Sequence, residues 1–399
     1  MEHVIRGKHG VQRRSFLKGS VFGAGSAILS AALLPQGLAA ADFHDGDGVP
    51  VTKGDIAILR FLSAVEQVEA DLWIQYAELG GATNQGLSPI DLELDGRAIQ
   101  TGLAPDYITA LEVLDGDMPQ YIADNTDDEI SHHRFLNNFL TSVGGEPVDL
   151  SRFATLPPSK VTGVPQNGRL TNLQQLTVET TWWTRYRSAT ANPDFGGSFE
   201  NAVPDLARGQ HSAIPRSDGD LGLNADGTPT NHLQAIANTA GFHFAFIEQG
   251  GTSLYPALAQ KVSNVQVLRV LLSIGGTEIM HFQTWHDKAG NAVPLTDGDL
   301  TFPDLNSGVD PNTGASGPNV ADEFQTNLIM PEPTLFLNRN LGPVSIIRPT
   351  STKEAGAVAA VVGFVKDGLF LDPSSGQNTG IVQVLMELAE EADAARRIG

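Results

Sequence analysis

The chain has 399 residues, and 41% of them are hydrophobic, which is enough for a large core. It contains no cysteine, and this excludes disulfides, thiolate-ligated metals, iron–sulfur clusters and thiol catalysis. With 46 Asp and Glu against 25 Lys and Arg, the formal net charge is -21. Nucleic acid and anionic lipid are therefore poor partners for this chain, whereas cations are good ones.

The N-terminus has the pattern of an export signal. Arg13-Arg14-Ser15-Phe16-Leu17-Lys18 is a twin-arginine motif, the weakly apolar stretch 21–34 follows it, and Ala39-Ala40-Ala41 offers a cleavage site. We expect residues 1–41 to be a twin-arginine signal peptide. The apolar stretch is too short for a stable membrane span, so a periplasmic or secreted location is expected after cleavage.

A first helix is predicted from about Asp55 to the Gly80-Gly81 stop. Its apolar stripe, at the spacing of one helix face, contains two acids, and it consists of Leu59, Leu62, Glu66, Glu69, Trp73 and Tyr76. A second helical region is predicted over about 105–143, and Pro119 is expected to kink or divide it. Glu129 and His132 lie on its apolar stripe.

Residues 144–230 are rich in Pro, Gly and Asn and are predicted to be mostly loop, with one helix over about 172–189. Trp182, Trp183 and Tyr186 on that helix are expected to pack onto the neighbouring helices, although a lid or a dimer contact is an alternative. The Asp-rich segments 218–220 and 297–299 are interpreted as ordinary turns, because neither completes a calcium-binding loop.

A third helix is predicted over about 231–250, with Glu248 on one face, and a fourth over about 264–288, with Glu278 and His281. The pair Gly275-Gly276 weakens the fourth helix and could allow close backbone approach. Two further helices are predicted near the C-terminus, one after the capping-box pattern at 351–354 and one over 379–397.

The central feature is a repeated Glu-x-x-His pair, Glu129-Ile130-Ser131-His132 and Glu278-Ile279-Met280-His281. Three residues apart on a helix, a carboxylate and an imidazole lie on the same face. Two such pairs, with one Glu from each of two other helices, form the ligand set of a four-helix-bundle dimetal site. Buried carboxylates need compensating positive charge, which two divalent cations would supply. Mixed oxygen and nitrogen ligation favours iron or manganese, and zinc remains an alternative.

These segments resemble the ferritin-like superfamily, in particular exported ferritin-like-domain proteins that include the desiccation-related proteins. The resemblance rests on residues 62–73, 128–132, 246–255 and 277–281. It implies an all-α ferritin-like four-helix bundle and a definite set of metal ligands. The implied ligands are Glu66, Glu129, His132, Glu248, Glu278 and His281.

Within that ligand set, Glu129 and Glu278 are expected to bridge the two metals. The resemblance favours Glu66 over Glu69 as the ligand from the first helix. Glu69, Trp73 and Tyr76 are then expected to support the ligands from outside, and His243 and His286 to be core or surface histidines, with support of a metal ligand as the alternative for either. His133 is expected to face solvent beside His132.

The expected organisation is a first helix pair (42–143), an insertion (144–230), a second helix pair (231–290) and a loop-rich, partly helical C-terminal extension (291–399). The expected function is redox handling of iron, O₂ or peroxide in stress protection, with ferroxidase-like or catalase-like chemistry. No catalytic residue is predicted beyond the metal ligands, and a homodimer is an open expectation. The alternative is a non-enzymatic envelope protein that uses the bundle as a scaffold or binding module.

Overall fold

The computed structural model describes residues 49–82, 93–94, 97–349 and 356–398. The predicted signal peptide and the capping-box pattern at 351–354 lie outside these ranges. Within them, no helix is long and apolar enough to cross a membrane.

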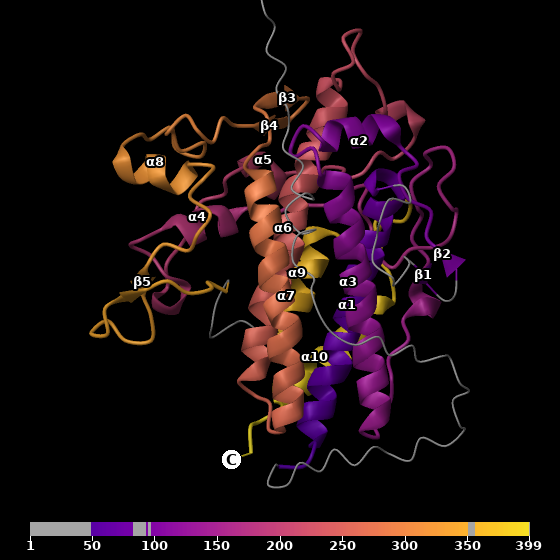
Figure 1. The fold of residues 1–399 in the computed structure, drawn as a ribbon, viewed down its shortest axis with the longest axis vertical. Helices are drawn as coiled ribbons and strands as arrows, with labels where there is room; N and C mark the ends of the chain where they lie inside the picture. The colour runs from indigo at the N-terminus through magenta and orange to yellow at the C-terminus, as the bar shows by residue number, and fades with distance from the viewer. Residues whose placement is uncertain (1–48, 83–92, 95–96, 350–355, 399) are drawn as a thin grey trace, which may run out of the picture. The chain divides into compact units, whose positions relative to one another are not determined.

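Four long helices form the centre of the fold, as predicted (Figure 1). They are α1 (Lys53–Gly80), α3 (Met118–Ser142), α6 (Asn231–Ala259) and α7 (Val265–Ala289). The most extensive helix contacts are those of α1 with α3 and of α6 with α7. The all-α bundle is therefore confirmed, and the strands of the described residues form only two-stranded antiparallel pairs.

The helix order explains why a long connection is needed between α3 and α6. The short helix α2 (Pro105–Leu111) directly precedes α3, and Gln234 near the start of α6 donates a hydrogen bond to the carbonyl of Ala110 in α2. Both α3 and α6 thus start at the same end of the bundle. Residues 143–230 must travel the length of the bundle, which is the crossover found in ferritin-like folds.

Local chemistry sets the helix boundaries. The side chain of Thr52 caps the backbone N–H of Asp55, and Asp55 caps Thr52 in return, so α1 begins two residues before the predicted Asp55 start. Pro119 divides the second helical region, as one of the two predicted outcomes, and lies in the first turn of α3. Asn264 caps α7.

Two predicted helices were wrong in length. The helix expected over 172–189 is only α4 (Thr181–Arg187), because Leu176 pairs with His211 in an extended bridge instead. The third bundle helix does not end at Gly250 but continues to Ala259. Gly251 is needed inside the helix, since a Cβ there would overlap Glu278 Oε2.

Aromatic residues attach the insertion to the bundle, as predicted. The ring of Trp182 packs against Phe282 at 5.8 Å between centroids and against His286 at 5.0 Å. Tyr186 packs against Phe282 at 4.9 Å. The insertion also contains α5 (Pro204–Arg208) and short 3-10 turns at Ser151–Phe153, Pro193–Phe195 and Asp218–Asp220.

The C-terminal extension also packs on the bundle. Its last helix, α10 (Ile381–Ala394), lies against α1, and α9 (Ala357–Asp367) lies against α10 and α6. In the chain, α7 is followed by α8 (Pro318–Phe324) and by short strands before α9 begins. The strand pairs of the described residues are β1–β2 (Glu93–Leu94, Arg97–Ala98), β3–β4 (Leu295–Asp297, Leu300–Phe302), β5–β6 (Thr334–Leu335, Pro343–Val344) and β7–β8 (Leu371–Asp372, Gln377–Asn378).

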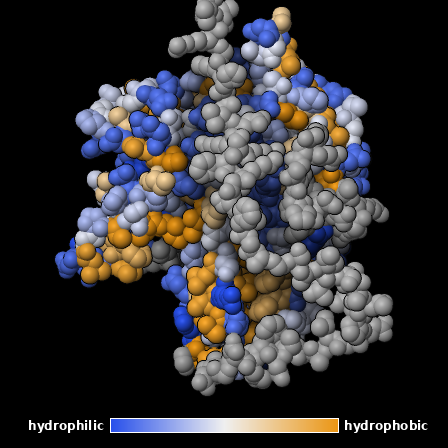
Figure 2. Space-filling view, in the orientation of Figure 1, coloured by the Kyte–Doolittle hydropathy of each residue, from blue (hydrophilic) through white to orange (hydrophobic). Residues whose placement is uncertain are grey.

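Both Asp-rich segments are turns, as predicted. Asp218 accepts hydrogen bonds from Thr162, and Asp220 pairs with Arg216 at 2.8 Å. Asp297 closes the β3–β4 hairpin, where Gly298 has a φ of 61°. Figure 2 shows a surface that mixes hydrophilic and hydrophobic residues, and Val265 and Leu272 on α7 are more than half exposed. The homodimer remains a prediction.

Candidate metal centre

The six predicted ligands converge from all four bundle helices. α1 supplies Glu66, α3 supplies Glu129 and His132, α6 supplies Glu248, and α7 supplies Glu278 and His281. They form two overlapping groups, in each of which one ligand atom per residue lies within 4.8 Å of the others. The first group is Glu66, Glu129, His132 and Glu278, and the second is Glu129, Glu248, Glu278 and His281.

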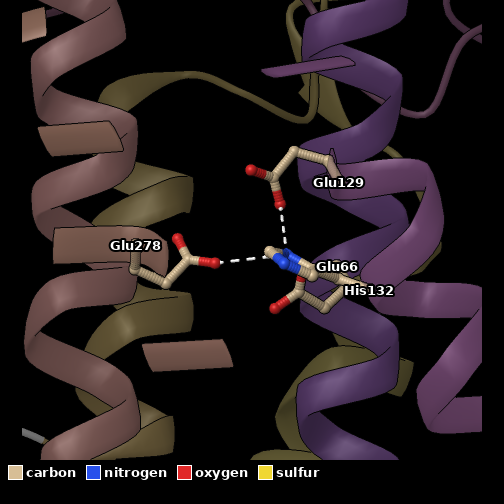
Figure 3. Close-up of side chains that lie close together, drawn as sticks. All are labelled: Glu66, Glu129, His132 and Glu278. Atoms are coloured by element: carbon tan, nitrogen blue, oxygen red, sulfur yellow. Dashed lines mark hydrogen bonds and ion pairs between the residues drawn. The ribbon is translucent and has the colours of Figure 1, made fainter. Parts of the chain in front are cut away.

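In the first group, three carboxylates surround one imidazole nitrogen (Figure 3). The Nδ1 of His132 lies 3.0 Å from Glu129 Oε2, 3.3 Å from Glu278 Oε1 and 3.4 Å from Glu66 Oε2. A single N–H cannot satisfy three carboxylates in three directions. A nitrogen lone pair and three carboxylates arranged in this way suit a bound cation instead.

The second group repeats this arrangement. The Nδ1 of His281 lies 3.1 Å from Glu129 Oε1 and 3.2 Å from Glu248 Oε2. Glu129 and Glu278 belong to both groups, which is the position a bridging carboxylate requires. A small opening of about 120 Å³, lined by Asp124, Asp128 and His281 among others, leads to this second group.

The Nε2 atom of each imidazole, which points away from the ligand carboxylates, contacts a residue of the other Glu-x-x-His helix. That residue directly precedes the Glu of the other pair. His281 Nε2 lies 2.9 Å from Asp128 Oδ2, and His132 Nε2 lies 3.3 Å from Thr277 Oγ1. Such contacts fix the tautomer, because an N–H at Nε2 leaves the Nδ1 lone pair directed at the carboxylates. We did not predict these roles for Asp128 and Thr277. Their position immediately before each Glu-x-x-His pair was the available signal.

Two further supporting residues were also missed. Asn125 donates hydrogen bonds from Nδ2 to Glu129 Oε1 at 2.9 Å and to Glu248 Oε1 at 3.0 Å, and it accepts one from Trp285 Nε1 at 2.6 Å. The Tyr255 hydroxyl donates to Glu66 Oε1. Asn125 lies four residues before Glu129 and Tyr255 seven after Glu248, so helix spacing places each on the ligand face.

The three predicted supporting residues, Glu69, Trp73 and Tyr76, differ in what they contact. Glu69 is buried and belongs to neither metal-compatible group, although the charges of Glu129, Glu278, Glu248 and Glu66 all act on it. Trp73 stacks on Trp285 at 5.1 Å. The Tyr76 hydroxyl lies 2.7 Å from His243 Nδ1. His243 and His286 are buried in the core, and burial lowers the pKa of His243 to about 3. His133 is half-buried rather than solvent-facing, and it belongs to neither group.

The electrostatics of the cluster are unfavourable without a cation. Burial raises the pKa of Glu66 to about 7, against the lowering effect of His132. Burial, together with the charge of Glu129, raises the pKa of Glu278 well above its usual value. Burial opposes the charge of His132, yet the carboxylates around it, Glu129 first, hold its pKa well above the ordinary value. Without a metal, these side chains therefore bind protons more tightly than they would in water.

Carboxylate oxygens in the cluster lack hydrogen-bond donors. Three buried carboxylate oxygens accept no hydrogen bond from the described residues. They are both oxygens of Glu278 and the Oε2 atom of Glu66. Leaving such atoms unpaired is costly. Four ligand carboxylates carry a charge of -4 when ionised, and two divalent cations would neutralise it. The residues present therefore fit bound divalent metal.

The fold and this cluster define a helical bundle with a carboxylate- and histidine-lined centre. The sequence profile of the ferritin-like domain family matches residues 54–290, more than half of the chain. The chain belongs to this family, and the matched region contains all four bundle helices and the whole cluster. No curated protein and no solved structure matches the chain.

Gly251 provides a direct test of the packing around Glu278. We expect Gly251→Ala to displace the Glu278 carboxylate, with a loss of roughly 1–3 kcal/mol in unfolding free energy. Gly276→Ala on α7 is the matched control, since its Cβ would meet no described atom within 4 Å and alanine favours the helix. Equal melting temperatures and equal metal contents for the two variants would contradict this account of Gly251.

The pKa shifts predict how stabilisation by a metal depends on pH. The carboxyl of Glu66 and the imidazole of His132 have a raised pKa in the fold, so they hold protons more tightly in the folded than in the unfolded chain. Their contribution to the unfolding free energy of the metal-free protein is therefore lost as pH rises. Metal binding displaces the same protons and removes this loss. We therefore expect the rise in Tm on adding Mn²⁺ to be several degrees larger at pH 8 than at pH 5.5.

Calorimetric scans of the same preparation with Mn²⁺ and with chelator measure this difference. Taking the difference at each pH cancels the contribution of distant groups such as His243. A Mn²⁺-induced rise that is constant or that shrinks with increasing pH would contradict the assignment.

Proposed function

We propose that this protein is an exported dimetal protein that handles iron, O₂ or peroxide through a pair of iron or manganese ions. The observation that carries the proposal is the pair of overlapping ligand groups that share Glu129 and Glu278. Membership in the ferritin-like domain family supports metal ions as partners. The export route is supported by the twin-arginine motif at Arg13-Arg14. The role in stress protection rests on the resemblance of the helix motifs to those of desiccation-related proteins.

In this proposal Glu66 and His132 would hold one ion, Glu248 and His281 the other, and Glu129 and Glu278 would bridge them. The ions would supply redox chemistry toward O₂ or peroxide. The chain's own contribution is to hold the ligands rigid. Asn125 fixes two carboxylates, Tyr255 fixes Glu66, and buried surroundings keep the electrostatic attraction of the ligands strong.

The first test is the metal content of a bridge variant. We expect wild type, purified after its own export, to carry close to two Fe or Mn per chain, and Glu129→Gln/Glu278→Gln to carry less than about a tenth of that. Glutamine keeps the shape of the side chain and removes the charge. The exposed pair Glu112→Gln/Glu146→Gln is the matched control and should keep the wild-type content.

Equal metal in the bridge variant and wild type would end the dimetal proposal. Metal-free wild type whose melting does not respond to added Fe²⁺ or Mn²⁺ would instead favour the scaffold alternative. If metal is present, peroxide disproportionation and Fe²⁺ oxidation assays separate catalase-like from ferroxidase-like chemistry.

The second test concerns the unequal supports of the two histidines. A carboxylate behind an imidazole increases its basicity more than a hydroxyl does, so the ion at His281 should bind more tightly than the ion at His132. We expect Asp128→Ala to weaken the tighter of two binding steps by about 10–100-fold. Thr277→Val should leave that step unchanged and affect the weaker one.

Equilibrium titration with Mn²⁺, followed by electron paramagnetic resonance of the free ion, resolves the two steps. Two equal steps in wild type, or equal effects of both substitutions on both steps, would contradict the assignment.

A further inference from the structure

A large apolar cavity lies between α1, α6 and α9. Its volume is about 480 Å³, within the range of roughly 300–1,000 Å³ that is usual for small-molecule sites. Most of the wall is aliphatic or aromatic, with Val65 and Leu72 from α1, Phe246 and Leu254 from α6, and Phe364 from α9. The α9 wall belongs to the C-terminal extension, beyond the residues that match the ferritin-like domain.

The cavity reaches the carboxylate cluster. Glu69 and Gly251 both line it, and a Cβ on Gly251 would overlap Glu278 Oε2. The Oε1 atom of Glu69 is buried and accepts no hydrogen bond from the described residues. An unpaired buried oxygen on a residue that lines a cavity is a polar group that a bound molecule could satisfy.

Two helical glycines hold the cavity open. Gly250 on α6 and Gly363 on α9 line it, and a Cβ on either would meet no described atom within 4 Å. Neither has a positive φ. Glycine inside a helix costs about 1 kcal/mol relative to alanine. Neither tight packing nor backbone geometry therefore requires glycine at these two positions. A side chain at either position would project into the cavity, and glycine leaves that space free.

The charged groups in the wall indicate which molecules fit. Glu69, Glu179 and Asp367 are acidic, and the basic residues of the described wall are Lys366 and His243. Burial lowers the pKa of His243 to about 3, so its imidazole is neutral at pH 7. A carboxylate, phosphate or ammonium headgroup would lose its hydration against mostly apolar walls. An uncharged molecule with an aliphatic or aromatic body avoids this cost.

We propose that this cavity binds an uncharged, apolar organic molecule beside the dimetal centre. The binding stands on the cavity alone, whereas the role of that molecule as a substrate rests on the function proposed above. The class includes aliphatic alcohols and simple aromatic compounds. The proposal gives the C-terminal extension a function, because α9 completes the binding wall.

Fluorescence of the uncharged probe N-phenyl-1-naphthylamine tests the proposal on the full chain, with and without Mn²⁺. We expect saturable binding that 1-decanol displaces, with decanoate and decylamine each at least about tenfold weaker, or roughly 1.4 kcal/mol. Absence of saturable probe binding would overturn the proposal. Displacement by decanoate or decylamine at lower concentration than by 1-decanol would overturn the uncharged class.

Substitutions locate the binding. Gly363→Leu adds a side chain within the cavity and should weaken probe and decanol binding by about tenfold or more. Val362→Leu, on the same helix at a position 55% exposed and outside the cavity wall, is the matched control and should bind as wild type does. If Gly363→Leu does not fold, Gly250→Leu fills the same space from α6. Unchanged binding in a folded variant would overturn the assignment to this cavity.

Metal analysis of the same samples separates the two proposals. Decanol binding in a protein that takes up no metal would support the cavity proposal and contradict the dimetal function. Two metals per chain without decanol binding would support the dimetal function and contradict the cavity proposal.

Discussion

Uncompensated negative charge at the centre of the bundle is the constraint on which the rest of the structure depends. Five buried carboxylates, Glu66, Glu69, Glu129, Glu248 and Glu278, lie in the interior of the bundle together with the two imidazoles of His132 and His281. Even two protonated histidines could not balance five ionised acids. Burial and mutual repulsion raise the pKa of most of these carboxyls, so the protein must hold protons or cations there. Two divalent cations would offset the charge and use the unpaired oxygens at once.

The parts outside the four helices shape the surroundings of this centre. The insertion places Trp182 against α7, while α9 and α10 of the extension cover α6 and α1. Two approaches to the cluster differ in character as a result. The small opening at Asp124, Asp128 and His281 is acidic and suits cations, whereas the larger cavity at Gly250 and Gly363 is apolar and suits an organic molecule.

The ligand cluster was predictable because helix periodicity is local. Spacing of three and four residues placed Glu129 beside His132 and Glu278 beside His281, and resemblance to ferritin-like proteins supplied Glu66 and Glu248 as their partners. Contacts between helices were not predictable in this way. Asp128 reaches His281, and Tyr255 reaches Glu66, only once the bundle is assembled. Gly250-Gly251 resembles a helix stop, but α6 continues through it, and the glycine at 251 leaves the space that the Glu278 carboxylate occupies. The cavity depends on α9, whose contact with α6 no local pattern indicates.

Anomalous X-ray diffraction from crystals of the metal-loaded protein, collected at the iron and manganese absorption edges, tests the central claim most directly. The account predicts two peaks about 3.5–4 Å apart, both within coordination distance of Glu129 and Glu278. One peak should lie against His132 and the other against His281. A fully loaded crystal with no peak between these side chains, or with peaks only at the protein surface, would contradict it.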